Sequence, residues 1–149
     1  MICVLQRVKS SSVTIKNQKY CEIGRGLNVL LAIEEDDNEK DLLWMAQKLI
    51  NIRIFSNESG KFDLSVKDIN GELLVISQFT LTGDCRKGRR PDFSKAMKIQ
   101  DAKEFYNKFI DNLKKIYIAQ KIKTGVFQEE MEVDIKNDGP VTVIIKSKK

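Results

Sequence analysis

The polar residues with the clearest potential for chemistry come directly after the most apolar stretch of the sequence. A strand is expected over residues 72–80, and it ends in Ser77, Gln78, Phe79 and Thr80. Because side chains alternate along a strand, Ser77 and Phe79 would point to the face opposite Thr80. Hydroxyl and amide groups at such a position need hydrogen-bond partners. They form either a polar strand end bonded to nearby backbone or part of a catalytic site.

The absence of histidine narrows the possible chemistry. Ser-His-Asp and Cys-His catalytic groups are excluded, and so is a histidine-ligated metal. An alcohol such as Thr80 is a weak nucleophile without an activating base. The three cysteines, Cys3, Cys21 and Cys85, lie far apart and include no Cys-x-x-Cys pair. We therefore expect a reducing, cytoplasmic setting, no metal site and no cofactor.

A second segment of interest is Asn-Asp-Gly-Pro at residues 137–140. These residue types are typical of turns, and a hairpin turn is expected between strands at residues 131–135 and 141–145. Gly139 can adopt backbone angles closed to other residues, and Pro140 lacks an N–H donor. If the bond between them were cis, the neighbouring carbonyls would face one side and could accept hydrogen bonds from an ammonium group.

Arg7 and the basic residues at positions 86–90 each need either hydrogen-bond acceptors or contact with solvent. Arg7 shares the face of an apolar strand with Cys3 and Leu5. A buried unpaired guanidinium is very unfavourable, so Arg7 either lies at an exposed strand end or binds the carbonyls of a loop. Residues 86–90 contain four cations in five residues, which could bind phosphates or simply be solvated. Aromatic residues are absent from this loop, so it is not a stacking platform for single-stranded nucleic acid.

Apolar periodicity predicts the elements that position these residues. Stripes at helical spacing indicate two helices, and alternating or continuous apolar runs indicate strands. Helices are expected over residues 38–51 and 99–115, and strands over residues 2–8, 12–16, 20–23, 27–33, 62–66, 72–80, 131–135 and 141–145. Many strands in local pairs predict a mixed α/β fold, with largely antiparallel β-sheets covered by two main helices.

Length and charge limit the class of protein. A chain of 149 residues fits a single domain, which is expected to span residues 1–149. No apolar run approaches the roughly 18 residues of a membrane-spanning helix, and the N-terminus does not resemble a signal peptide. The net charge of +5 suits a polyanionic partner such as nucleic acid, and no membrane partner is expected.

Taken together, these segments resemble the D-aminoacyl-tRNA deacylase family, also called the D-tyrosyl-tRNA deacylase family. The resemblance covers essentially the whole chain and depends on two motifs, Ser-Gln-x-Thr at residues 77–80 and Gly-Pro at residues 139–140. Flanking agreement lies at residues 6–8, 12–14, 23–27, 53–56, 60–61, 88, 90–93, 124–127, 137–138 and 141–142. Asp92 departs from the pattern, because the family more often has Ser at that position.

The resemblance implies a hydrolase that cleaves the ester bond of D-aminoacyl-tRNA and rejects L-aminoacyl-tRNA, a form of chiral proofreading in translation. It also implies a homodimer whose sheets are barrel-like across the dimer, with the active site at the interface. A cis Gly139–Pro140 bond would enter the partner's pocket, where its carbonyls hold the α-amino group and leave no room for an L side chain. Arg7 would brace this loop.

The resemblance also assigns residues to the site. The implied catalytic residues are Ser77, Gln78, Phe79 and Thr80, and the implied substrate-binding residues are Gly139, Pro140, Arg7, Met131 and Phe127. Met131 and Phe127 would lie near the aminoacyl end and the terminal adenosine of the tRNA acceptor end. Thr80 resembles a nucleophile by position, but it lacks a histidine base. We therefore favour direct attack by water, with backbone N–H groups of Phe79 and Thr80 stabilising the oxyanion and the ribose 2′-hydroxyl assisting.

Two other functions are compatible with the sequence. A non-catalytic nucleic-acid-binding module on the same fold would use residues 86–90 and bind generic RNA or DNA in a salt-sensitive way. A structural dimerisation domain would use residues 139–140 only as an interface turn. It would therefore tolerate replacement of both residues with no loss except association.

Overall fold

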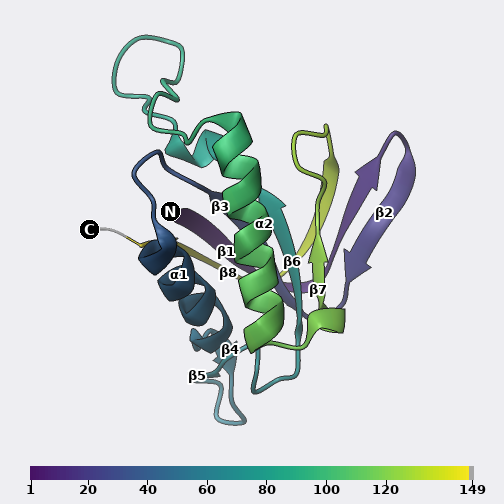
Figure 1. Ribbon diagram of the computed structural model, residues 1–149. Helices are drawn as coiled ribbons and strands as arrows, with labels where there is room; N and C mark the ends of the chain where they lie inside the picture. The colour runs from purple at the N-terminus through teal and green to yellow at the C-terminus, as the bar shows by residue number, and fades with distance from the viewer. Residues whose placement is uncertain (148–149) are drawn as a thin grey trace.

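The computed structural model describes residues 1–147, so Lys148 and Lys149 lie outside the described residues (Figure 1). In chain order the elements are β1 (Ile2–Ile15), β2 (Gln18–Ile23), β3 (Gly26–Ala32), α1 (Glu39–Asn51), β4 (Phe55–Ser56), β5 (Phe62–Leu64), β6 (Glu72–Ser77), the 3-10 turn η1 (Phe79–Thr82), α2 (Ile99–Ile116), the 3-10 turn η2 (Ala119–Lys121), β7 (Ile122–Thr124) and β8 (Glu132–Lys146). Both helices lie on one face of the main sheet (Figure 1). The expected mixed α/β fold is confirmed.

The 14-residue strand β1 runs through the main sheet and combines the two strands expected at residues 2–8 and 12–16. β3 pairs antiparallel with its first half and β2 with its second half, while β8 pairs antiparallel along its other edge. β6 and β7 extend the sheet beyond β3 in parallel. The Cys21 thiol of β2 donates a hydrogen bond to the Thr124 carbonyl of β7 at 3.4 Å, so the sheet curves almost into a barrel. Within residues 1–147 β8 pairs only with β1, which leaves its outer edge open.

The two helices form close to where the sequence predicts them. Asn38 caps α1, since its side chain accepts a hydrogen bond from the Lys40 N–H at 3.0 Å and its own N–H donates to the Asp41 carboxylate at 3.1 Å. The apolar faces of both helices pack on β3 and β6 in the main core, where Met45 and Phe109 are fully buried. No helix in the described part of the chain is long and apolar enough to cross a membrane.

One local expectation about the Gly-Pro segment is wrong. The strands expected on either side of residues 137–140 form one strand, β8, so the chain makes no hairpin turn there. Both halves of β8 pair with β1, but the register shifts from Gln6 opposite Thr142 to Val8 opposite Asn137. The residues between Asn137 and Thr142 therefore bulge out of the ladder opposite a single residue of β1. The turn-forming residues at positions 137–140 therefore form a β-bulge instead of a hairpin turn.

The strand expected at residues 72–80 is also shorter than the sequence suggests. β6 ends at Ser77, and the chain then turns into η1. Phe79 and Thr80 therefore belong to a 3-10 turn, and the strand alternation expected for them is wrong. The N–H of Gln78 donates to a carbonyl of β3 at 2.7 Å, which is the last backbone bond to β3 before the chain leaves the sheet.

Candidate active site

A cavity of about 670 Å³ opens where β6 ends. Its wall includes Ser77, Gln78 and Phe79 from the β6–η1 segment, and Phe127 and Met131 from the segment before β8. Further apolar lining comes from β3 and from the segment that leads into α2. The structure thus brings together five of the residues that the family resemblance assigns to the site.

Burial and hydrogen bonds fix the end of β6. Leu73 and Val75 are fully buried, and the hydroxyl of Tyr106 in α2 donates a hydrogen bond to the Val75 carbonyl at 2.9 Å. Burial raises the pKa of Tyr106 well above its ordinary value, so the hydroxyl keeps the proton that it donates. Ser77 and Gln78 are therefore held at the cavity by contacts from both β3 and α2.

The η1 turn places Phe79 and Thr80 in different surroundings. The Thr82 hydroxyl donates to the Phe79 carbonyl at 2.8 Å, and the Phe79 ring packs edge-on against Phe93 with centroids 5.2 Å apart. The Phe79 residue is still 57% exposed. Thr80 is exposed and does not line the cavity, and its hydroxyl accepts a hydrogen bond from Gln78 Nε2 at 2.6 Å. An amide donor cannot remove the hydroxyl proton, so this contact does not activate Thr80 as a nucleophile.

Phe127 and Met131 close the opposite wall of the cavity. The Phe127 ring packs against Tyr106 at a centroid distance of 5.9 Å, and Met131 Sδ accepts a hydrogen bond from the Val126 N–H at 3.3 Å. Gly125 permits this arrangement, because a Cβ at that position would lie 2.8 Å from Met131 Sδ. The ring and the thioether give this wall an apolar surface.

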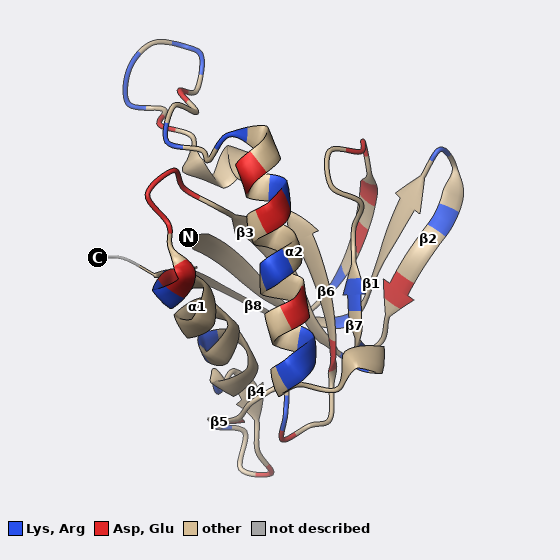
Figure 2. Cartoon of the chain, in the orientation of Figure 1, with Lys and Arg blue, Asp and Glu red and all other residues tan. Residues whose placement is uncertain are grey.

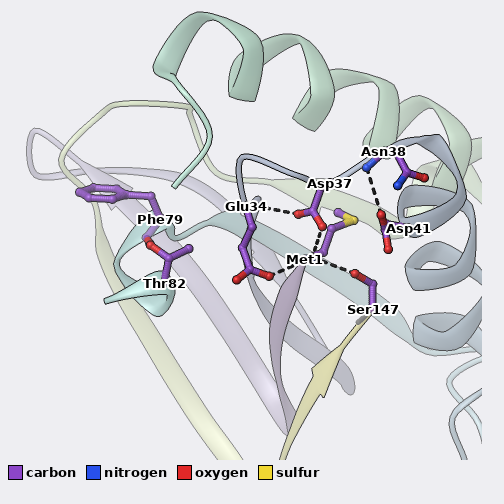
Figure 3. A network of polar contacts seen from close by, with 8 residues as sticks. All are labelled: Met1, Glu34, Asp37, Asn38, Asp41, Phe79, Thr82 and Ser147. Carbon is purple, nitrogen blue, oxygen red and sulfur yellow. Dashed lines mark hydrogen bonds and ion pairs between the residues drawn. The ribbon is translucent and has the colours of Figure 1, made fainter. Parts of the chain in front are cut away.

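A buried ionic network includes Glu34, the residue that follows Ile33 of the cavity lining (Figure 3). The Met1 α-ammonium group is fully buried and donates to the Glu34 carboxylate at 3.3 Å, to the Ser147 hydroxyl at 2.8 Å and to the Asp37 carboxylate. The Asp37 carboxylate also accepts a hydrogen bond from the Glu34 N–H at 2.7 Å. These contacts fix the connection between β3 and α1.

The β3–α1 connection in turn supports the cavity. The Glu35 N–H donates to the Lys95 carbonyl at 2.9 Å, and the Met97 N–H donates to the Ile33 carbonyl at 3.0 Å. Ile33 and Met97 both line the cavity. A change in the ionic network should therefore reach the cavity wall through these backbone bonds.

A separate cluster surrounds Arg7, which is 9% exposed. Its guanidinium donates to the Asp138 carbonyl at 3.0 Å and to the Ile54 carbonyl at 2.9 Å. The Asp138 carboxylate lies 3.4 Å from Arg7 Nε, and the Phe62 ring centroid lies 5.4 Å from the guanidinium carbon. Arg7 was expected either to lie at an exposed strand end or to bind the carbonyls of a loop. The structure shows that it binds loop carbonyls.

The loop held by Arg7 contains the Gly139–Pro140 bond, which is cis. Gly139 has a φ of 126°, and a Cβ there would lie 2.9 Å from Val141 Cγ2 and 3.1 Å from Arg7 Nη2, so only glycine fits. Both Gly139 and Pro140 are exposed. The loop thus presents its tip to solvent while a nearly buried arginine fixes its base.

The two clusters lie apart within one chain. Neither Arg7 nor residues 139–140 line the cavity. The strand register places Ser77 of β6 level with Leu31 of β3 and Cys3 of β1, and Arg7 lies four residues beyond Cys3 along β1. β8 itself reaches the cavity through Val133, and Gly139 lies six residues further along that strand.

Sequence reasoning missed two aromatic residues that complete these clusters. Phe93 packs on Phe79 at the cavity, and Phe62 covers the guanidinium of Arg7. The available signal was weak, because each is a lone aromatic residue beside a polar loop.

Fold and cavity together define a class: a mixed α/β protein whose site offers hydroxyl, amide and backbone groups, in a chain without histidine. Within residues 1–147, no group of three or more cysteine, aspartate or glutamate side chains could hold a metal ion. The chain belongs to the family described as D-Tyr-tRNA(Tyr) deacylase, whose profile matches residues 4–146.

Individual relatives agree with this family. A protein named D-aminoacyl-tRNA deacylase from Natranaerobius thermophilus is 53% identical over 149 residues, covering 100% of this chain and 99% of the relative. A solved structure titled c-Myc DNA Unwinding Element Binding Protein is 45% identical, with a TM-score of 0.94 and 98% of both chains covered. A structure described as a probable eukaryotic D-amino acid tRNA deacylase has a TM-score of 0.85 over 97% of each chain, and at 17% identity it shows the shared fold alone.

Proposed function

We propose that this protein hydrolyses the ester bond of D-aminoacyl-tRNA and releases free D-amino acid and tRNA. Membership of the family and relatives that carry this name support the proposal. The observation that carries it is the cavity at the end of β6, where Ser77, Gln78 and Phe79 meet Phe127 and Met131. Its volume of about 670 Å³ is typical of small-ligand sites, so it fits an aminoacyl-adenosine end rather than a nucleic-acid stem.

The proposal includes a homodimer in which each chain completes its partner's site. The Gly139–Pro140 loop does not line the cavity of its own chain, although Val133 at the start of the same strand does. The open edge of β8 carries Ile144, which is 65% exposed, and such an edge is a natural pairing surface. A two-fold axis would place each loop at the partner's cavity and create two identical sites.

The loop would supply the stereospecificity. The Asp138 carbonyl is bonded to Arg7, so we assign the carbonyls of Gly139 and Pro140 to the α-ammonium group of the substrate. With the ammonium group and the ester fixed, the α-carbon can direct its side chain only into the apolar part of the cavity. An L side chain would instead meet the loop, so the L substrate is rejected by a steric clash.

Water is the proposed nucleophile. Phe79 and Thr80 are the first residues of η1, and the first N–H groups of a helical turn lack acceptors within that turn. Of these two residues Phe79 lines the cavity, so its N–H would stabilise the oxyanion that forms when water attacks the ester carbonyl. The water loses a proton and the leaving ribose oxygen gains one, with the neighbouring ribose hydroxyl as the relay, while Ser77 and Gln78 orient the reacting groups. The reaction serves chiral proofreading in translation, which implies a cytoplasmic location.

Deacylation of matched D- and L-tyrosyl-tRNA by the purified protein, with and without a chelator, tests this proposal. We expect release from the D form to be faster by at least about 100-fold, because a blocked side chain costs on the order of 3 kcal/mol, and we expect no effect of the chelator. Equal inertness toward both substrates would contradict hydrolysis and favour the non-catalytic nucleic-acid-binding module. Loss of activity with the chelator would contradict the metal-free chemistry.

A further inference from the structure

A loop rich in basic residues, residues 84–92, protrudes from the body of the protein (Figure 2). Residues 84–98 contain six Lys or Arg residues and two Asp residues, so this segment alone has a net charge of +4, against +5 for the whole chain. The four cations among residues 86–90 are all exposed. Figure 2 shows the basic segments around the outer part of the loop and the acidic ones at its base. Such a concentration of positive charge attracts an anionic partner.

The base of the loop is fixed by backbone and ionic contacts. Asp84 and Asp92 close it through two backbone hydrogen bonds of 2.8 and 2.9 Å. Arg86 Nε donates to the Asp84 carboxylate at 2.9 Å, so the charge of Arg86 is neutralised within the loop. The Asp92 carboxylate accepts a hydrogen bond from the Ser94 N–H at 2.9 Å. The loop therefore leaves the body of the protein in a defined direction.

The outer part of the loop is open and its cations are not neutralised. Among residues 1–147, no carboxylate forms an ion pair with Lys87, Arg89 or Arg90. Gly88 between them has a φ of 70°, and no atom lies within 4 Å of where its Cβ would be. Three cations at an open turn can approach an extended anionic surface without displacing any part of the protein.

The positive charge continues from the loop to the cavity. Phe93 directly follows the loop, lines the cavity and packs on Phe79. Lys95 and Lys98 come next, both are exposed, and Lys98 lines the cavity itself. An anionic chain whose end lies in the cavity would therefore leave it beside these cations.

We propose that Lys87, Arg89 and Arg90 bind the phosphate backbone of the tRNA acceptor arm while the cavity holds its aminoacylated end. This inference rests on the proposed function and adds the surface that binds the body of the nucleic acid. Residues 84–92 include no aromatic side chain that could stack on a base. Contacts from lysine and arginine to phosphates carry no sequence information, which suits an enzyme that must accept tRNAs of different sequence.

Two triple variants of the full chain lose the same charge at different places. The loop variant is Lys87→Ser, Arg89→Ser and Arg90→Ser, and the control variant is Lys108→Ser, Lys114→Ser and Lys115→Ser. The control residues are exposed and lie on the second half of α2, up to about 24 Å along the helix from its start at the cavity. Each variant is assayed with D-tyrosyl-tRNA and with the D-tyrosyl ester of adenosine, which can occupy only the cavity.

The loop variant should lose activity only toward the large substrate. We expect its kcat/KM for D-tyrosyl-tRNA to fall at least about 10-fold near 0.15 M salt, through KM, with the adenosine ester unaffected. The plot of log(kcat/KM) against log salt concentration should become shallower by about 2–3, because each phosphate contact contributes roughly 0.7–0.9. The control variant should stay within about twofold of wild type with both substrates.

A binding measurement separates this inference from the proposed function. Fluorescence anisotropy with uncharged tRNA should show weaker binding by the loop variant than by the control, even if the protein hydrolyses neither substrate. Equal tRNA binding and equal kcat/KM for the two variants would overturn the inference. An equal fall with the adenosine ester would also overturn it, since it would place the damage in the cavity. A wild-type protein inert toward both esters would overturn the proposed function instead.

Discussion

The cavity at the end of β6 and the loop of β8 are built in opposite ways. The loop is fixed from inside, because a nearly buried Arg7 holds the carbonyls of Asp138 and Ile54 and leaves only the Gly139–Pro140 tip exposed. The cavity is supported from behind, but its rim is exposed at Phe79 and lacks any contact from the loop of the same chain. This difference is what the proposed dimer requires, in which the loop of one chain completes the cavity of its partner.

Arg7→Ala should lower activity the most, because it removes the side chain that fixes the Gly139–Pro140 loop and leaves the cavity unchanged. The carbonyls of Ile54 and Asp138 would lose a charged donor at a cost of about 1–3 kcal/mol, and the loop would lose its position. Since a displacement of about 1 Å can cost 100-fold, we expect kcat/KM for D-tyrosyl-tRNA to fall at least about 100-fold in single-turnover assays. Arg53→Ala, which removes an exposed arginine paired with Asp63, is the control and should change little. A comparably small loss for Arg7→Ala would contradict the fixed loop.

Asp37→Asn should weaken the buried ionic network that fixes the β3–α1 connection next to the cavity. The Met1 ammonium group would lose a buried anionic partner, which costs about 3–5 kcal/mol, so the denaturation midpoint should fall clearly. Activity in the cold should fall less than for Arg7→Ala, because the change reaches the cavity only through the β3–α1 connection. Glu35→Gln removes the same charge from an exposed side chain of that connection and serves as the control. If both variants unfold at the same denaturant concentration, the ionic network does not support this wall.

Thr80→Ala should have the smallest effect on activity. It tests whether the Thr80 hydroxyl takes part in the reaction. Its hydroxyl accepts a hydrogen bond from Gln78 and lies outside the cavity lining, so its loss should cost about 0.5–1.5 kcal/mol, or about 10-fold in kcat at most. Single-turnover rates at saturating substrate, with circular dichroism as the check on folding, measure this effect. A loss of several orders of magnitude in a folded protein would restore the hypothesis that Thr80 is the nucleophile.

Elements with a local signal could be predicted from the sequence. The helix expected over residues 99–115 is observed as α2, Ile99–Ile116, because an apolar stripe at helical spacing is contained within the helix itself. The hairpin expected at residues 137–140 is wrong because Asn, Asp, Gly and Pro favour a change of chain direction in a hairpin and in a bulge alike. That distinction depends on pairing with β1, at the other end of the chain.

The site was predictable in its residue types and less so in its geometry. The hydroxyl and amide groups after the apolar strand were compatible with a site, and the family resemblance assigned them to one. The strand end at Ser77 and the turn that moves Thr80 away had no clear signal. Likewise Arg7 was known to need acceptors, while the acceptors themselves lie 47 and 131 residues away in the sequence. Contacts between residues so far apart in the sequence depend on how the sheet packs and not on the local sequence.

Mixing two inactive variants tests the shared site most directly. One variant carries Gly139→Ala and Pro140→Ala in the loop, and the other carries Ser77→Ala and Gln78→Ala in the cavity. After joint unfolding and refolding, half of the dimers would be mixed, and each mixed dimer would have one site with an intact cavity and an intact partner loop. We predict recovery of about a quarter of the wild-type activity toward D-tyrosyl-tRNA. If the mixture stays as inactive as the separate variants, each site is formed within one chain, which would contradict the shared site.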